Sequence, residues 1–194
     1  MLHPEMRKAI AAVHPLDDDS WAAFAACWVP MSYSKNEIIT REGETERYFY
    51  FVLDGVQRLY HLQDGQEHIL GFSFDHSFSG VFDSFLKQRP ATLFLDAITD
   101  SRMLAITLAD FTRMVEEHPT VERWFRKFLA EILIGRLERE VELLSCTAEE
   151  RFRRVFQRSP RAVQLIPSKH LASYLGMAPE TLSRVKQKVW NDNS

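Results

Sequence analysis

Charged and hydroxyl side chains recur at helical spacing near the end of the chain. The segment PETLSRVKQKVW begins at Pro179 and contains no further proline or glycine. Residues three and four positions apart share one face of a helix, so we expect Glu180, Ser183 and Arg184 to lie together. In a DNA major groove, arginine binds guanine through two hydrogen bonds and glutamate accepts one from cytosine. These residue types therefore predict a helix that reads DNA bases.

Other polar side chains nearby suit DNA phosphates, whose contacts fix the register of a helix without reading sequence. The remaining predicted DNA-contacting residues are Ser168, Lys169, Ser173, Pro179, Thr181, Lys186 and Lys188. The alternative is a solvated pair of helices that only stabilises a dimer.

The charge distribution favours the DNA interpretation. The net charge of -3 hides an asymmetry: residues 146–194 carry 9 basic and 4 acidic side chains, and residues 1–145 carry 15 and 23. A polyanion is attracted to the basic segment and repelled by the acidic one. Ordinary solvated helices can show a similar excess, so charge alone does not decide the function.

The elements that position these residues are helices joined by short turns. The segment SKHLASYL ends just before Gly176, and PETLSRVKQKVW follows after Ala178. Glycine permits the positive φ that lets the second helix leave at a steep angle. The pattern predicts a helix-turn-helix. A further helix, AEERFRRVFQR, ends before Pro160.

A long helical pattern precedes this segment. Residues 120–144 contain no proline and one glycine, and apolar residues recur every four positions at Phe125, Leu129, Leu133, Leu137 and Val141. Such a helix would be roughly 37 Å long. We expect a homodimer through residues 120–144, because a second copy is the simplest cover for so much apolar surface. The alternative is a helix that packs only within its own chain.

The front of the chain is typical of an antiparallel β roll. Two short helices are expected within residues 4–28 and another within residues 107–119. Between them, short aromatic or alternating runs such as YFYFVL, VQRLYHLQ and EHILGFSF are separated by turns at Asp54-Gly55 and Asp64-Gly65. Short strands with Asp-Gly hairpin turns indicate a barrel or roll and not βαβ units.

Two long segments resemble a known family. The run ITREGETERYFYFVLDGVQRLYHLQDGQEHIL resembles a cyclic-nucleotide-binding β roll, and IPSKHLASYLGMAPETLSRVKQKV resembles the helix-turn-helix of the Crp/Fnr regulators. The resemblance implies an α+β fold in which an antiparallel β roll (a double-stranded β-helix) with flanking helices is followed by a long dimerisation helix and a helix-turn-helix. It implies a sensor domain at 1–118, a dimerisation helix at 119–145 and a DNA-binding domain at 146–194. The implied function is a homodimeric transcription regulator whose effector, bound in the roll, repositions the DNA-reading helices.

Two departures from the family pattern concern DNA binding. Ala178 stands where the family usually has a capping residue, which costs the helix start roughly 1 kcal/mol, and Pro179 replaces a basic residue. The sequence also stops at Ser194, before the β-hairpin wing that the family generally adds. Fewer phosphate contacts predict weaker binding with a shallower salt dependence. The alternative function is therefore a sensor or dimeric scaffold that no longer binds DNA.

The resemblance also implies a ligand-binding cassette, and the residues that match it are Gly80, Val81, Arg89, Ala91 and Thr92. Val81 replaces the acid that would accept from the ribose hydroxyl, which leaves that group unpaired at a cost of roughly 1–3 kcal/mol. Pro90 removes a backbone N–H. Asp83 can substitute only in a remodelled loop, and Arg89 can instead pair with an acidic neighbour. No cofactor is assigned: a cyclic nucleotide is doubtful, the effector is unknown, and side chains can also fill the roll.

Other function classes find little support. His61, His68 and His76 are seven and eight positions apart without an HxH pair, and Cys27 and Cys146 lack a CxxC partner, so no metal site is expected. No phosphate loop or nucleophile elbow appears, and we expect no enzyme. No apolar run reaches the length of a membrane span and the start lacks a signal core, which predicts a cytoplasmic protein.

Overall fold

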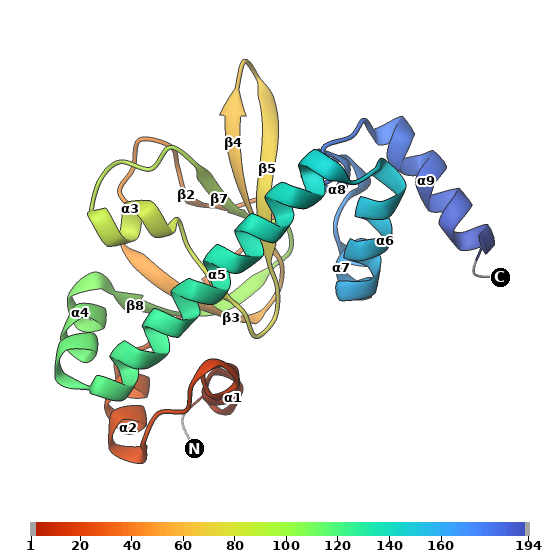
Figure 1. The fold of residues 1–194 in the computed structure, drawn as a ribbon. Helices are drawn as coiled ribbons and strands as arrows, with labels where there is room; N and C mark the ends of the chain where they lie inside the picture. The colour runs from red at the N-terminus through yellow and green to blue at the C-terminus, as the bar shows by residue number, and fades with distance from the viewer. Residues whose placement is uncertain (1–2, 193–194) are drawn as a thin grey trace. The chain divides into compact units, whose positions relative to one another are not determined.

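The computed structural model describes residues 3–192, which form two compact units. The first unit comprises residues up to 60 and 72–132, and the second comprises residues 61–71 and those from 133 onward. Helix α5, Pro119–Ser145, is continuous and passes from the first unit to the second after Ile132 (Figure 1). Each unit is described separately below.

Two short helices open the first unit, as predicted. These are α1, Pro4–Val13, and α2, Asp18–Ala26. The carboxylate of Asp17 caps α2 by accepting a hydrogen bond from the backbone N–H of Ser20 at 2.8 Å. The buried side chains of α1 and α2 join the core of the unit.

The predicted antiparallel roll is confirmed as two four-stranded sheets. One sheet has the order β1-β8-β3-β6 and the other has the order β2-β7-β4-β5. The bounds of the strands are β1 Val29–Tyr33, β2 Ile38–Thr40, β3 Tyr48–Asp54, β4 Gln57–Gln63, β5 Gln66–Ser73, β6 Phe78–Ser79, β7 Phe94–Ala97 and β8 Ser101–Thr107. All the described pairings of β1, β3, β6 and β8 are antiparallel.

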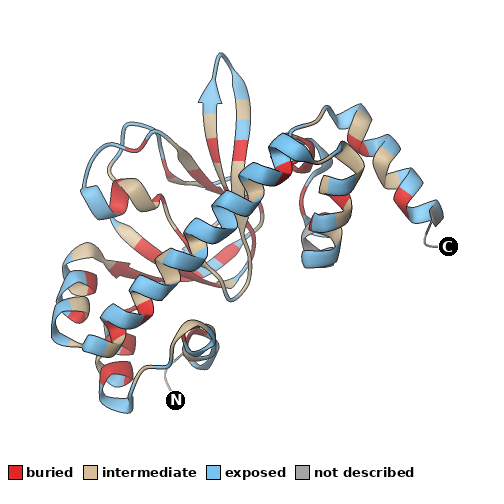
Figure 2. Ribbon diagram, viewed as in Figure 1, coloured by how far each residue is buried: buried red, intermediate tan, exposed pale blue. Residues whose placement is uncertain are grey.

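Strand β3 separates two apolar clusters. Phe49 and Phe51 pack with α2, with α4 (Leu108–Glu117) and with Trp124 of α5. Tyr50 and Val52 point the other way, into the interior of the roll. This division follows from the strand period of two, which places alternate side chains on opposite faces. Figure 2 shows buried residues along the strands and on the helix faces that contact them.

Helices make up most of the second unit. The C-terminal part of α5 is followed by α6 Ala148–Arg158, α7 Pro160–Leu165, α8 Ser168–Tyr174 and α9 Pro179–Asp192. A capping box between Thr147 and Glu150 starts α6. The core side chains of these helices include Phe152, Leu171, Leu182 and Val189. None of the helices in residues 3–192 is long and apolar enough to cross a membrane.

Four elements were not predicted from the sequence. Pro30 obscured β1, but β1 lies at the edge of its sheet, where a missing backbone N–H is tolerated. Strand β6 has only two residues, and α3 (Phe82–Lys87) and α7 have six each, so a periodic pattern cannot reveal them.

Candidate functional site

A tight turn at Gly176 joins α8 to α9. Gly176 has a φ of 62°, which confirms the predicted left-handed conformation. The N–H of Met177 donates to the carbonyl of Ala172 at 3.1 Å, and the N–H of Gly176 donates to that of Ser173 at 3.0 Å. These two bonds form a Schellman motif, which ends α8 and turns the chain toward α9.

Arg151 of α6 stabilises this turn through its guanidinium group. Its guanidinium donates to the carbonyl of Cys146 at 2.7 Å and to that of Gly176 at 3.4 Å. Sequence reasoning missed Arg151 because both acceptors are backbone atoms, 5 and 25 positions away.

The three predicted base-reading residues lie on the exposed face of α9. Glu180, Ser183 and Arg184 are exposed, whereas Leu182 and Val189 face the core. The side chains of these three residues make no hydrogen bond or ion pair with another residue in the described range 3–192. Their polar groups are therefore available to a partner molecule.

The phosphate-contacting candidates on α9 are more constrained. The ammonium of Lys188 pairs with Glu149 of α6 at 2.7 Å. The ammonium of Lys186 donates to the hydroxyl of Ser168 at 3.3 Å, and burial lowers the pKa of Lys186. Pro179 is the first residue of α9, and Thr181 is half-buried.

Two candidates on α8 contact the β4–β5 hairpin (residues 61–71). The Ser173 hydroxyl donates to the carbonyl of Glu67 at 2.9 Å and accepts from the N–H of Ile69 at 3.1 Å. The Glu67 carboxylate lies 3.8 Å from Lys169 Nζ and 3.6 Å from His170 Nδ1. In this structure the hairpin therefore engages the Ser173 hydroxyl, which the sequence analysis assigned to a DNA phosphate. The residues in these contacts are more than a hundred positions apart, so no local sequence pattern reveals the contacts.

Helix α5 also holds α8. The guanidinium of Arg139 lies 3.6 Å from the ring centre of Tyr174 and donates to the Tyr174 carbonyl at 2.6 Å. Burial lowers the pKa of Arg139. A cation over an aromatic face, combined with a hydrogen bond, makes this a strong local attachment.

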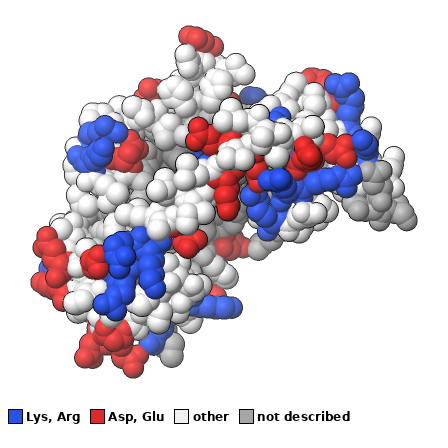
Figure 3. Space-filling model, in the orientation of Figure 1, with Lys and Arg blue, Asp and Glu red and all other residues white. Residues whose placement is uncertain are grey.

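Basic side chains gather over α6 and α9. Figure 3 shows Lys and Arg side chains there with carboxylates among them. Several of the arginines are paired: Arg153 with Glu149 at 3.0 Å, and both Arg154 and Arg158 with Glu142 at 3.5 and 2.9 Å. These pairs reduce the positive field that the sequence alone suggests.

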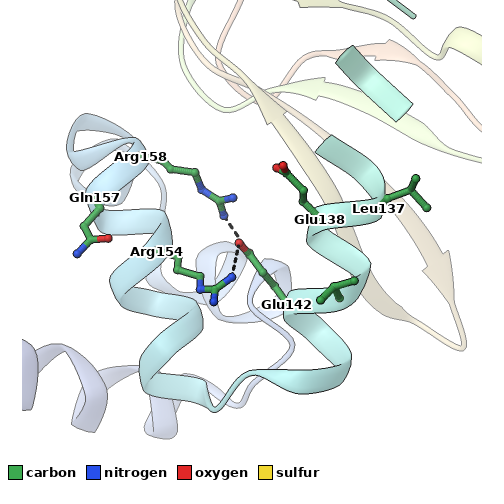
Figure 4. A pocket seen from close by; sticks show the side chains of 7 residues that line it. Leu137, Glu138, Glu142, Arg154, Gln157 and Arg158 are labelled. Atoms are coloured by element: carbon green, nitrogen blue, oxygen red, sulfur yellow. Dashed lines mark hydrogen bonds and ion pairs between the residues drawn. The ribbon is translucent and has the colours of Figure 1, made fainter. Parts of the chain in front are cut away.

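A hollow of about 590 Å³ lies between α5 and α6 (Figure 4). Leu137 and Val141 line it on the α5 side, and the Glu142 ion pairs lie across it. Leu137 is 54% exposed and Val141 is 59% exposed. The exposed apolar residues of this part of α5 are Leu133, Ile134, Leu137, Val141, Leu143 and Leu144. Five of them share one helix face, and we call these five the α5 stripe: Leu133, Ile134, Leu137, Val141 and Leu144.

The predicted ligand cassette does not form a phosphate site. Arg89 lies at the surface, where its guanidinium pairs with Asp83 at 3.0 Å, which is the alternative pairing considered for it. The N–H of Ala91 donates to the carbonyl of Glu44 at 2.8 Å. Val81 is fully buried, Gly80 has a φ of 142°, and Thr92 is exposed. These residues do not fit a cyclic nucleotide, because Val81 offers no acceptor to its ribose hydroxyl and the Ala91 N–H is already engaged.

The histidines considered as metal ligands are not assembled into a cluster. Among the residues that the structure describes, no three His, Cys, Asp or Glu side chains are placed to hold a metal ion.

Comparisons with known proteins agree with this architecture. Residues 30–118 match the family of cyclic nucleotide-binding domains. The nitrogen fixation regulation protein FixK of Bradyrhizobium diazoefficiens is 28% identical over 169 residues, which cover 81% of this chain and 70% of FixK.

Solved structures show the same fold over most of the chain. FixK2 from Bradyrhizobium japonicum has a TM-score of 0.76 at 22% identity and covers 86% of each chain. The catabolite activator protein of Thermus thermophilus has a TM-score of 0.59 at 23% identity, covering 95% of this chain and 88% of that protein. The c-di-GMP-responsive global regulator CLP of Xanthomonas campestris has a TM-score of 0.70 at 17% identity, covering 91% of this chain and 93% of CLP. The resemblance drawn from the sequence is thus confirmed: residues 30–118 match the family of cyclic nucleotide-binding domains, and the chain has the fold of the Crp/Fnr regulators.

Proposed function

We propose that this protein is a homodimeric, cytoplasmic transcription regulator of the Crp/Fnr type that reads DNA with α9. The observation that carries the proposal is the exposed, unpartnered set of Glu180, Ser183 and Arg184 on one face of that helix. Arg184 reads guanine and Glu180 reads cytosine, and each good contact discriminates by roughly 1–3 kcal/mol.

The α5 stripe supports the dimer. Its five apolar side chains are between 49% and 81% exposed in the single chain. Leu133, Leu137 and Val141 are four positions apart, a spacing that lets a second copy of α5 pack along the same face. Two α9 helices then contact successive major grooves about 34 Å apart.

The relatives support the regulatory role. FixK is named as a regulator of nitrogen fixation, and CLP is named as a regulator that responds to c-di-GMP. In this chain, a ligand or partner at the roll shifts the equilibrium between states in which the two α9 helices have different spacing, because it binds one state more tightly.

A DNA-binding experiment tests the assignment. Selection from a random duplex library should yield a pseudo-palindromic site, and fluorescence anisotropy should show that Arg184→Ala reduces affinity for it by about tenfold or more. Arg102→Ala, which removes an exposed arginine of the roll, is the matched control and should bind normally. Equal binding of the selected and scrambled duplexes by wild type and Arg184→Ala would exclude Arg184 as the base reader.

The competing function is a sensor or dimeric scaffold that does not bind DNA. The engagement of Ser173 and Lys169 by the hairpin favours it, because two predicted phosphate contacts are occupied. A salt titration separates the two functions: a DNA-binding protein with several phosphate contacts loses affinity steeply as salt rises, whereas a scaffold shows no binding to lose.

A further inference from the structure

The roll contains a cavity of about 490 Å³ whose lining includes none of the predicted cassette residues, although Val81 and Ala91 donate hydrogen bonds to two residues of its wall, Glu46 and Glu44. Its wall includes Tyr33 of β1, Thr40 of β2, and Glu46, Tyr48 and Tyr50 at the start of β3. All of these residues belong to the first unit. The volume falls within the range of about 300–1,000 Å³ that is typical of small-molecule sites.

Three tyrosine rings meet at this cavity. The ring centres of Tyr33 and Tyr50 are 6.2 Å apart and those of Tyr48 and Tyr50 are 6.0 Å apart. The hydroxyls of Tyr33 and Tyr50 are within 3.4 Å of each other. Because the face of an aromatic ring carries negative potential, such a wall attracts cations as well as apolar groups.

Glu46 places a buried acid beside these rings. It is 2% exposed, and its carboxylate accepts from the Thr40 hydroxyl at 2.6 Å and from the Val81 N–H at 3.3 Å. The Tyr48 N–H, at 3.2 Å, and the Tyr50 hydroxyl, at 3.4 Å, donate to its other oxygen. Three of these four bonds are long, so they compete weakly with a charged donor.

The Glu46 carboxylate lacks a positive partner. No side-chain nitrogen of a Lys, Arg or His among the described residues lies within 4.0 Å of it. The 2% exposure of Glu46 raises its pKa, because burial disfavours the charged form, and a cation beside the carboxylate would favour that form again. Arg47 and Glu44 also line the cavity, but both are exposed, and solvent screens their charges. The buried carboxylate therefore dominates the field inside.

We propose that this cavity binds a small organic cation, an amine whose ammonium pairs with Glu46 and whose carbon skeleton lies against Tyr33, Tyr48 and Tyr50. The ligand is the effector of the regulator proposed above, and its regulatory meaning rests on that proposal. An anion such as a cyclic phosphate is disfavoured at the same place, because it would meet a buried negative charge.

The position of the cavity on β3 connects it to α5. Tyr48 and Tyr50 face the cavity, and the residue between them, Phe49, packs on the opposite side of the strand. The ring centre of Phe49 is 6.0 Å from that of Phe128 of α5. A ligand that shifts β3 therefore acts on the first part of the proposed dimerisation helix through one intervening side chain.

Isothermal titration calorimetry with three probes of one shape tests the charge requirement. Tyramine carries an ammonium, tyrosol a neutral hydroxyl, and 4-hydroxyphenylacetate a carboxylate on the same ring. Tyramine should bind at least about tenfold more tightly than tyrosol, and 4-hydroxyphenylacetate should not bind. Equal binding of tyramine and tyrosol, preferential binding of the anion, or no binding of tyramine up to about 10 mM would overturn the proposal.

Variants locate the site. Glu46→Gln should lose about tenfold or more in tyramine affinity, and Glu42→Gln, an exposed acid in the preceding turn, should leave it unchanged. If Glu46→Gln is unfolded by circular dichroism, Tyr33→Leu tests the site instead, because it removes one aromatic ring from the cavity wall. It should weaken tyramine binding about threefold or more, and unchanged affinity would place the amine elsewhere.

The two proposals fail separately. Tyramine binding without any DNA binding would leave the ligand assignment intact and remove the regulator. Sequence-specific DNA binding without tyramine binding would keep the regulator and remove the ligand assignment. If both hold, tyramine should change the affinity for the selected duplex in wild type and not in Glu46→Gln.

Discussion

The hydroxyl of Ser173 on α8 donates a hydrogen bond to the backbone carbonyl of Glu67, 106 positions earlier, at 2.9 Å. The same hydroxyl accepts from the N–H of Ile69 at 3.1 Å, so it satisfies both polar groups that this part of β5 presents to α8. The Glu67 side chain adds an ion pair with Lys169. The hairpin thus occupies the surface of α8 where a DNA phosphate would be expected.

Removing the Glu67 charge should strengthen DNA binding. In Glu67→Gln, Lys169 loses its acidic partner while both backbone hydrogen bonds of Ser173 remain. A surface ion pair of this kind contributes roughly 0.2–1 kcal/mol, so we expect affinity for the selected duplex to rise by about 1.4- to fivefold. Fluorescence anisotropy at two salt concentrations measures the change.

The control for this experiment is Asp64→Asn, which removes an exposed acid from the turn of the same hairpin in the same unit. It reports the general effect of one fewer negative charge. Equal gains in both variants would mean that the Glu67 contact does not restrain α8.

A charge within the α5 stripe should prevent dimerisation. Leu137 is more than half exposed in the single chain, so Leu137→Lys leaves the folded monomer intact but buries an ammonium in the proposed interface. We expect the dimer dissociation constant to rise by about a hundredfold or more, measured by sedimentation velocity. Glu131→Gln makes the same change in charge off the stripe and should stay dimeric. A dimer of unchanged strength in Leu137→Lys would exclude this interface.

Hydrophobic periodicity predicted most of the elements because their period and their burial agree. β3 is an example: its alternation separates Phe49 and Phe51 from Tyr50 and Val52, which belong to different clusters. The helices α8 and α9 were likewise predicted from Gly176 and from the spacing after Pro179. The short elements β6, α3 and α7 were missed because they span at most six residues.

The candidate sites were predictable only in part. Glu180, Ser183 and Arg184 depend on local helix geometry, and sequence spacing is enough to group them. Glu46 was missed because it lies in the polar run GETER, a composition typical of an exposed turn. Its burial depends on Thr40, Val81 and Ser84, and the last two are at least 35 positions away.

Gly176 should not tolerate a side chain. Alanine at a φ of 62° costs roughly 1–2 kcal/mol, and its Cβ would lie 3.2 Å from Leu143 Cδ2. We expect Gly176→Ala to lower the thermal midpoint of the second unit and to weaken DNA binding, because the direction of α9 changes. Gly135→Ala is the matched control: its Cβ meets no atom within 4 Å apart from the backbone of its own helix, so stability should rise by about 0.5–1 kcal/mol. Equal midpoints in both variants would contradict the role assigned to the turn.

Asp17 should make the first unit sensitive to acid. Its carboxylate accepts from Ser20 and, at 2.8 Å, from the hydroxyl of Thr120 at the start of α5. These hydrogen bonds, the Ser20 N–H first, lower its pKa from 3.8 to about 2. Because the folded-state pKa lies below the unfolded value, the stabilisation is present above pH 3.8 and is lost as the pH falls toward 2. The thermal midpoint of Asp17→Asn should therefore lie below that of wild type at pH 6 and approach it near pH 2, as followed by circular dichroism. Asp19→Asn, in the same helix turn, should follow wild type, and a constant difference between Asp17→Asn and wild type across this range would show that titration of Asp17 contributes nothing.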